Sequence, residues 1–177
     1  SLLSHLTTSK QGDHLPLYRC EEVSLRNGWW IPRSTQASWL CQTAVTAVIL
    51  YSWMAGRILQ GKLIGTDATG VPVLDPGAGQ VRKGTVWTYC GQQEVCPYLI
   101  YDYWPNGEGE APRRFLHGYE GYLQADAATV FDQLYLQGPI LEVACGAHMR
   151  RYFYKARNSA PHEAHRALGY FRQLYML

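Results

Sequence analysis

The chain has 177 residues, 47% of them hydrophobic, which is enough for one ordinary domain with a packed core and excludes an intrinsically disordered chain. Its formal net charge of +2 is too weak by itself to indicate a nucleic-acid partner. The longest apolar run, residues 44–55, is interrupted by Thr46 and Ser52. Because this run is too short to cross a bilayer, we expect a buried helix there.

The cysteines indicate the compartment. They are odd in number and include no Cys-x-x-Cys pair: Cys20, Cys41, Cys90, Cys96 and Cys145. This pattern predicts reduced thiols in a cytoplasmic protein, not a disulfide or zinc framework. The first ten residues, SLLSHLTTSK, lack the long apolar stretch of a signal peptide. Because the chain starts without methionine and stops inside a predicted helix, we expect a fragment of a longer protein.

Residues 1–61 are predicted to be helical. One helix is expected over residues 18–25, and Asn27-Gly28 ends it. Ser34 is the expected N-cap of a long helix over residues 35–60, which Gly61 terminates. The order helix, turn, helix suggests a DNA-binding helix-turn-helix, but two packed helices that bind no DNA fit equally well.

From residue 62 the pattern changes to strands. Segments 62–66 and 71–74, then 86–89 and 97–103, are rich in apolar and β-branched or aromatic residues and are joined by short connections. A short helix follows over residues 110–117, with Pro112 in its first turn. Further strands are expected at 121–125 and 140–145, and further helices at 127–136, 147–157 and 161–177.

This order predicts an α/β protein with a mixed sheet. Three antiparallel strands come first, and parallel strands alternating with helices follow. The order of elements fits the ribonuclease H-like (RNase H-like) fold. We expect three regions: a helical segment 1–61, an incomplete core 62–157, and the start of a helical insertion at 158–177.

Two aspartates are candidates for a metal site. In that topology the first and fourth strands are parallel neighbours, Asp67 lies on the first, and Asp126 follows the fourth, 59 positions later. Two close carboxylates repel each other unless a cation lies between them, and Mg²⁺ prefers such oxygen ligands. The alternative is that each aspartate only forms a turn or a cap. Asp75, in an Asp-Pro-Gly turn, and Asp102, expected on the solvent face of the third strand, are weaker candidates.

The helix over residues 147–157 is basic. It carries five cationic or titratable side chains interleaved with aromatic residues: His148, Arg150, Arg151, Lys155 and Arg157. These side chains either contact DNA phosphates or form the solvated face of an amphipathic helix with Met149 and Phe153 turned inward. His148 is expected in the core or beside the acidic site, because no second metal ligand lies at suitable spacing on this helix.

Several segments resemble a known family. They are HLPLYRCEE (14–22), PRSTQASWL (32–40), TDATGVPVLDPGAGQVRKGTVWTY (66–89), YDYWPNGEGEAPRRFLHGYEGYLQADAATVFDQLY (101–135) and CGAHMRRYFYKA (145–156). Together, in this order, they are similar to the insertion-sequence 66 family of bacterial transposases.

The resemblance implies a DDE-type transposase, in which an RNase H-like core cuts and joins DNA with Mg²⁺ or Mn²⁺. Asp67 and Asp126 would be its first and second acids. Arg150, Arg151 and Lys155 would contact DNA. The resemblance further implies transposon ends and target DNA as partners, self-association as a transposase oligomer, and a cytoplasmic, nucleoid-associated location in a bacterium.

The chain also departs from the family pattern. Ala68 stands where the family has Glu, Ala111 where it has His, and Gly146 where it has Trp. The family's third acid is a glutamate in an Asn-Asn-x-x-Glu-Arg motif beyond a helical insertion, and this motif is absent from the sequence. The chain is therefore predicted to be inactive by itself. The alternatives are a non-catalytic DNA-binding remnant and a decayed copy without function.

Overall fold

The computed structural model describes residues 1–75, 77, 79–91, 97–107 and 109–176. The chain divides into two compact units, Ser1–Trp53 and Met54–Leu177. The first unit is helical, and the second contains a mixed sheet with its helices, which confirms the predicted α/β class and the helical amino-terminal region. The helices that begin in the first unit are α1 (Leu2–Thr7), a π-helical turn (Thr8–Gly12), α2 (Leu17–Arg26) and α3 (Arg33–Leu59).

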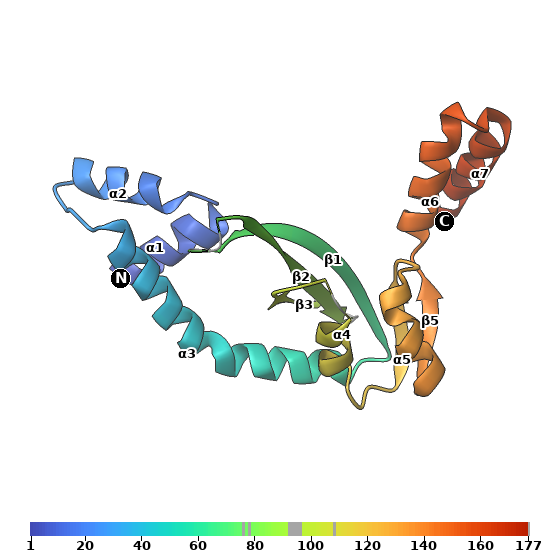
Figure 1. Cartoon of the computed structure of the whole chain (residues 1–177), viewed down its shortest axis with the longest axis horizontal. Helices are drawn as coiled ribbons and strands as arrows, with labels where there is room; N and C mark the ends of the chain where they lie inside the picture. Colours follow the sequence, from blue (N-terminus) through green and yellow to red (C-terminus); the bar gives the residue numbers. More distant parts are fainter. Residues whose placement is uncertain (76, 78, 92–96, 108, 177) are drawn as a thin grey trace. The chain divides into compact units, whose positions relative to one another are not determined.

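The sheet has the strand order β3-β2-β1-β4-β5. β1, β2 and β3 are antiparallel, whereas β1, β4 and β5 are parallel, as predicted. The two predicted segments 62–66 and 71–74 form one long, curved strand (Figure 1). The strands are β1 (Leu63–Leu74), β2 (Val81–Gly91), β3 (Tyr98–Trp104), β4 (Gly121–Ala125) and β5 (Ile140–Ala144).

The helices between and after these strands are short. The segment predicted as one helix over 127–136 is a 3₁₀ turn followed by a short α-helix. At the carboxyl end of the described residues, two helices joined by a 3₁₀ turn form a helical hairpin. These elements are α4 (Glu110–Phe115), the 3₁₀ turn Thr129–Phe131, α5 (Asp132–Gln137), α6 (Gly146–Lys155), the 3₁₀ turn Ala156–Asn158 and α7 (Pro161–Leu174).

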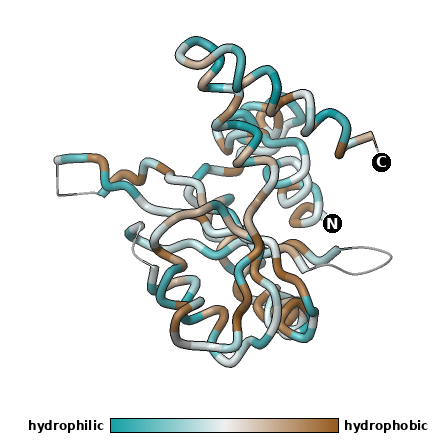
Figure 2. Tube along the Cα trace, turned by 90° about the vertical axis from the view of Figure 1, so that its right-hand side faces the viewer, coloured by the Kyte–Doolittle hydropathy of each residue, from teal (hydrophilic) through white to brown (hydrophobic). Residues whose placement is uncertain are grey.

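One face of the sheet forms the core of the second unit. The fully buried residues Ile64, Tyr89 and Leu123 lie on this face, on three neighbouring strands. Tyr89 stacks on Phe115 of α4, with 3.8 Å between ring centroids. Hydrophobic residues recur along the strands and helices of the chain (Figure 2). Burial of these large apolar surfaces is the main favourable contribution to folding of the unit.

Asp102 does not lie on the solvent face of β3, where it was predicted. It shares a face with the buried Ile100 and is half-buried, whereas Tyr101 and Tyr103 occupy the exposed face. Burial raises the pKa of the Asp102 carboxyl, and the Arg114 guanidinium partly offsets this increase. The prediction was wrong because tyrosine tolerates water through its hydroxyl, so aromatic residues did not mark the buried face.

The junction between β1 and β4 is short and sterically tight. Only three residue pairs join the strands, from Leu63↔Tyr122 to Gly65↔Gln124. The Tyr122 N–H donates to the Lys62 carbonyl at 2.8 Å. Gly121 has φ +154°, and a Cβ there would lie 2.8 Å from the Lys62 carbonyl oxygen. Glycine is therefore required at position 121 if the two strands are to approach.

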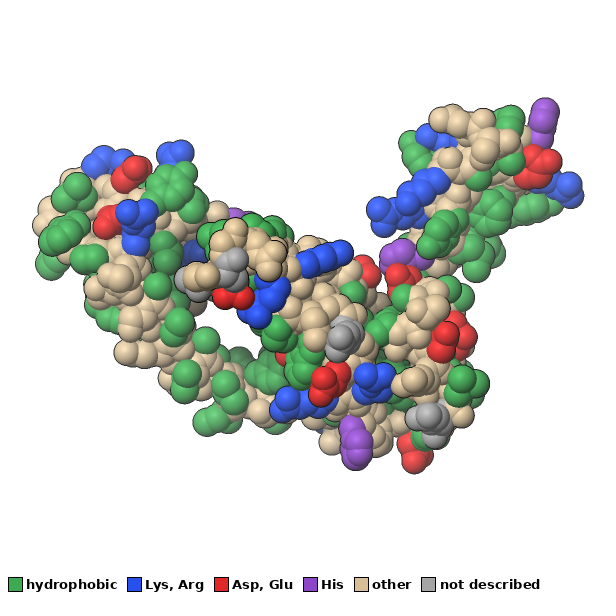
Figure 3. All heavy atoms as spheres, viewed as in Figure 1, with side chains coloured by type: hydrophobic (Ala, Val, Ile, Leu, Met, Phe, Trp, Pro, Cys, Tyr) green, Lys and Arg blue, Asp and Glu red, His purple; other side chains and the backbone are tan. Residues whose placement is uncertain are grey.

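Helix α3 begins two residues before its predicted start. The Pro32 carbonyl accepts the first helical hydrogen bond, from Gln36 N–H at 3.0 Å, so Ser34 lies inside the helix and is not its N-cap. The apolar run 44–55 is helical as predicted but is not buried, since side chains such as Val45 and Ile49 are exposed; hydrophobic side chains follow the helix in Figure 3. Among the described residues, no helix combines the length and hydropathy needed to span a membrane.

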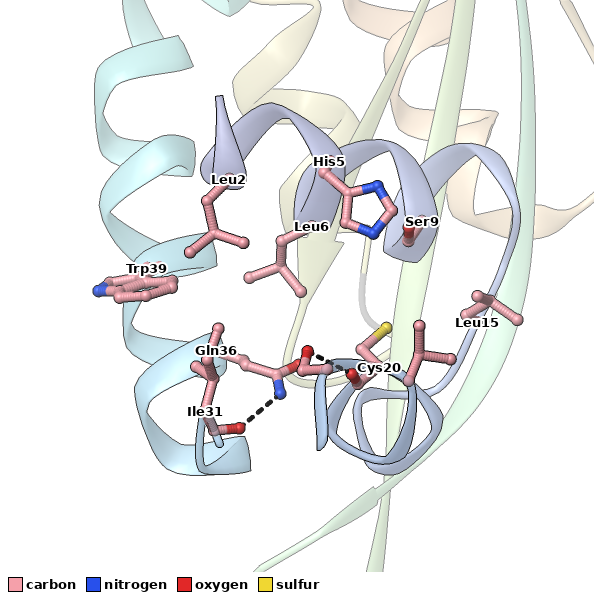
Figure 4. A pocket seen from close by; sticks show the side chains of 11 residues that line it. Leu2, His5, Leu6, Ser9, Leu15, Cys20, Ile31, Gln36 and Trp39 are labelled. Carbon is pink, nitrogen blue, oxygen red and sulfur yellow. Dashed lines mark hydrogen bonds between the residues drawn. The ribbon is translucent and has the colours of Figure 1, made fainter. Parts of the chain in front are cut away.

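A small cavity lies within the first unit (Figure 4). It has a volume of about 80 Å³ and is bordered mainly by apolar side chains of α1, α2 and α3. Gln36 is buried at its edge and donates from Nε2 to the Ile31 carbonyl at 2.8 Å. Arg33 and Glu21 form an ion pair at 3.0 Å between α3 and α2. The helices are thus packed together, and DNA binding by this unit stays a prediction.

We expect Gly121→Ala to destabilise the second unit by about 2 kcal/mol or more, because backbone strain adds to a clash with the Lys62 carbonyl. The matched control is Gly169→Ala in α7, where a Cβ meets nothing within 4 Å. It should stabilise the protein by about 0.4–1 kcal/mol. Urea unfolding followed by circular dichroism measures both changes. Equal stability of the two variants would contradict the tight junction.

Candidate metal and nucleic-acid site

Asp67 lies within β1, four residues after its start. Its side chain is exposed and points to the face opposite Ile64 and Thr66, and its strand neighbour on β2 is Thr88. The carboxylate Oδ1 accepts a hydrogen bond from the Ala68 N–H at 2.8 Å. Oδ2 makes no hydrogen bond to any described residue, so this carboxylate has capacity for a ligand.

Asp126 directly follows β4 and is half-buried. The three β1–β4 pairs share a constant offset, since 122−63, 123−64 and 124−65 are each 59. The offset between Asp67 and Asp126 is also 59, so a register continued two residues past Gly65↔Gln124, and one residue past the end of β4, would set them opposite each other. Adjacent strands lie about 4.8 Å apart, which is a distance one cation can bridge.

Asp75 does more than occupy a turn. Its carboxylate lies 3.7 Å from Arg82 Nη1, and this ion pair links the ends of β1 and β2. Pro76 of the predicted Asp75-Pro76-Gly77 turn lies outside the described residues. Because Asp75 is ten residues from Gly65, the last β1 residue paired with β4, the structure does not bring it to Asp126.

Tyr135 on α5 is a neighbour of Asp126 that the sequence did not identify. Its hydroxyl is buried and has no hydrogen-bond partner among the described residues. Burial, together with the smaller effects of the Glu142, Asp126 and Asp132 carboxylates in that order, raises the pKa of Tyr135 to about 12. A phenol kept neutral next to carboxylates can donate a hydrogen bond to an oxygen anion.

The described residues contain no group of three or more His, Cys, Asp or Glu side chains arranged to hold a metal. The candidate site therefore rests on two carboxylates. That number fits Mg²⁺, which commonly takes one or two protein carboxylates and completes its shell with water and substrate phosphate. A site of this kind can act on a phosphodiester only when the nucleic acid supplies further oxygen ligands.

Helix α6 begins next to this site. Cys145, the residue before it, donates its N–H to the Ala125 carbonyl at 3.0 Å, and Ala125 precedes Asp126. His148, one turn into the helix, is half-buried, and its Nδ1 is buried without a hydrogen-bond partner in the described part of the chain. The four described cysteines, Cys20, Cys41, Cys90 and Cys145, are free thiols, while Cys96 lies outside the described residues.

The predicted DNA-contacting residues on α6 are accessible to solvent. Arg150, Arg151 and Lys155 are all exposed. Phe153 turns toward α7, with its ring centroid 6.1 Å from that of Phe171. Met149 was predicted to turn inward with Phe153, but it is 46% exposed. The helix is therefore amphipathic and has a solvated basic face, an arrangement that either reading of this helix requires.

We expect Tyr135 to titrate near pH 12, well above the ordinary value of about 10. Since the folded-state pKa is raised, its contribution to stability is present below pH 10 and is lost as the pH rises through about 12. Tyr135→Phe should remove this part of the pH dependence. Glu142→Gln should lower the pKa, whereas Glu163→Gln on α7 should leave it unchanged. NMR of ¹³Cζ-labelled tyrosine measures the titration. An unchanged pKa of Tyr135 in Glu142→Gln would contradict the proximity of Glu142 to the Tyr135 hydroxyl.

Comparison with known proteins identifies the family. Three proteins of Sinorhizobium fredii are similar to this chain. Protein y4qI is 30% identical over 175 residues, which cover 92% of this chain and 32% of that protein. Protein y4jD is 26% identical over 164 residues, with 86% and 32% covered, and y4hP is 25% identical over 170 residues, with 88% and 29% covered. The chain therefore spans about a third of the length of the curated relatives it matches.

The family model described as "Transposase IS66 family" matches residues 1–177, the full length of the sequence. A match of this extent covers both units, the two candidate acids and the basic helix. The chain belongs to the IS66 family of transposases.

Proposed function

We propose that this chain forms part of a transposase whose RNase H-like core cleaves DNA and transfers strands with a divalent metal ion. The observation that carries the proposal is the 59-residue register between β1 and β4, because the same offset separates Asp67 and Asp126. Family membership and the order of the mixed sheet support it. The proposed organisation is a helical region 1–61, a core 62–157 and the start of an insertion at 158–177.

Asp67 and Asp126 would hold Mg²⁺ or Mn²⁺ through their carboxylate oxygens. When bound, such an ion polarises phosphate oxygens and promotes ionisation of the attacking water or 3′ hydroxyl. Asp67 presents its carboxylate from a rigid strand, which favours precise positioning. The guanidinium groups of Arg150 and Arg151 would hold the phosphodiester, with Lys155 adding charge further along the helix.

The proposed partners are transposon ends, target DNA and further copies of the transposase, and the proposed location is the bacterial cytoplasm, at the nucleoid. A second candidate is a DNA-binding remnant that performs no chemistry. The absence of a third carboxylate beside Asp67 and Asp126 among the described residues favours this alternative for the chain taken alone. Both candidates require DNA binding, and only the first requires the two aspartates.

We expect weak Mn²⁺ binding that needs both aspartates. Asp67→Asn and Asp126→Asn each remove one anionic ligand and should weaken binding at least about tenfold. Asp75→Asn is the matched control, because Asp75 is paired with Arg82 instead. Isothermal titration calorimetry and paramagnetic line broadening measure the affinity and the location. Unchanged binding in both single variants would rule out this site.

The chain alone should not join DNA strands. Two carboxylates leave the metal cage incomplete, since the third acid of the family pattern is absent from this sequence. Purified protein incubated with Mg²⁺, labelled transposon ends and target plasmid should yield no joined product on a denaturing gel. The positive control is a full-length relative assayed on its own transposon ends. Robust joining by the 177-residue chain would show that the two-acid site is sufficient.

A further inference from the structure

The α6–α7 hairpin concentrates the positive charge of the chain. Residues 146–176 hold six of the sixteen Lys and Arg residues but only one of the fourteen Asp and Glu residues, Glu163. The hairpin therefore carries +5, and the remainder, with ten cationic and thirteen anionic residues, carries −3. Lysine and arginine side chains project from it in Figure 3. This charge separation suits a polyanionic ligand at the hairpin.

A cleft of about 590 Å³ lies between the two helices of the hairpin. Arg150 of α6 and Arg172 of α7 line it from opposite sides, and no acidic side chain borders it. Neither guanidinium forms an ion pair with a residue that the structure describes. Two unpaired guanidinium groups in one concave site match the geometry of a phosphate, which arginine can bind through two donors.

The other arginine near this cleft is already engaged. Arg157 lies over the ring of Tyr154, 3.5 Å from its centroid, and its Nε donates to the Tyr154 carbonyl at 3.1 Å. Arg166 on α7 is exposed but does not line the cleft. Arg150 and Arg172 are thus distinguished from the other arginines of the hairpin by lining the cleft.

The remaining lining of the cleft is apolar and aromatic. It consists of Ala147, Leu168, Tyr175 and Met176. The Tyr175 hydroxyl lies 4.0 Å from the point where a Cβ on Gly146 would be, so this side chain reaches from α7 to the start of α6. Tyr175 is 66% exposed, which leaves its ring accessible. A paired duplex offers only its backbone to such a surface, whereas an unpaired base can stack on it.

We propose that this cleft binds an unpaired nucleotide of DNA, with the phosphate between Arg150 and Arg172 and the base against Tyr175. The inference rests on the DNA binding in the proposed function. It adds Arg172 as a DNA-contacting residue and single-stranded DNA as the form that is bound. The cleft lies within the size range of ordinary small-ligand sites and can accommodate one nucleotide. A processed DNA end with a single-stranded overhang would supply both the phosphate and the unpaired base that this cleft binds.

Fluorescence anisotropy of the full chain tests the proposal with a blunt 21-base-pair duplex and with the same duplex carrying a four-nucleotide 3′ overhang. The wild-type chain should bind the overhang form more tightly. Arg172→Ala should weaken that binding about fivefold or more, and the matched control Arg166→Ala less than about twofold. The wild-type preference for the overhang should be about fivefold or more, and Tyr175→Ala should abolish it. The variants Tyr175→Phe and Tyr170→Ala should retain it.

Each outcome decides the proposal. Equal losses in Arg172→Ala and Arg166→Ala, with wild-type binding intact, overturn the cleft but leave DNA binding by α6 standing. Equal affinity of the wild-type chain for blunt and overhang DNA overturns the unpaired nucleotide. Failure of the wild-type chain to bind either DNA overturns this inference together with the DNA-binding part of the proposed function, whereas the Mn²⁺ titration still tests the acidic site. Circular dichroism verifies that each variant is folded. Folding is expected to be retained because the substituted side chains are exposed.

Discussion

The three-pair contact between β1 and β4 is the constraint on which the candidate site depends. Without it Asp67 and Asp126 belong to unrelated segments of the chain. The contact uses only three of the five residues of β4, and it is close because Gly121 lets the Lys62 carbonyl approach. The Tyr119 hydroxyl adds a hydrogen bond to the Tyr122 carbonyl at 3.1 Å. A few backbone contacts therefore set the register of β1 against β4, on which the proposed pairing of the two carboxylates depends.

Topology was predictable from the sequence, because it follows from local signals. Alternating apolar residues and glycine-rich or proline-rich turns gave the five strands to within a few residues of their observed bounds, and short connections gave the antiparallel part. The parallel neighbours followed from the helices between them. Predicting that β1, which carries Asp67, and β4, which Asp126 follows, are neighbours required no more than this order.

The details that depend on long-range packing were not predictable. The face on which Asp102 lies is decided by which side of β3 the tyrosines occupy, and tyrosine suits either side. Tyr135 carries no motif, and its raised pKa arises from burial and from Glu142 on another strand. Arg172 is one arginine among many in the sequence, and only the packing of α7 on α6 sets it opposite Arg150. A titratable residue just downstream of a candidate acid was the one available signal for Tyr135.

The distribution of charge links the two proposed sites. The chain outside the hairpin carries −3, and the candidate catalytic residues are themselves carboxylates, so that region repels DNA when no cation is bound. The hairpin, which carries +5, would attract the same ligand. A divalent ion at Asp67 and Asp126 would remove the repulsion, and phosphate oxygens would complete its coordination shell. By linkage, metal and DNA should each raise the affinity for the other by the same factor. In the proposed arrangement the basic hairpin would retain a DNA end, while the acidic site would accept its phosphodiester only together with the metal.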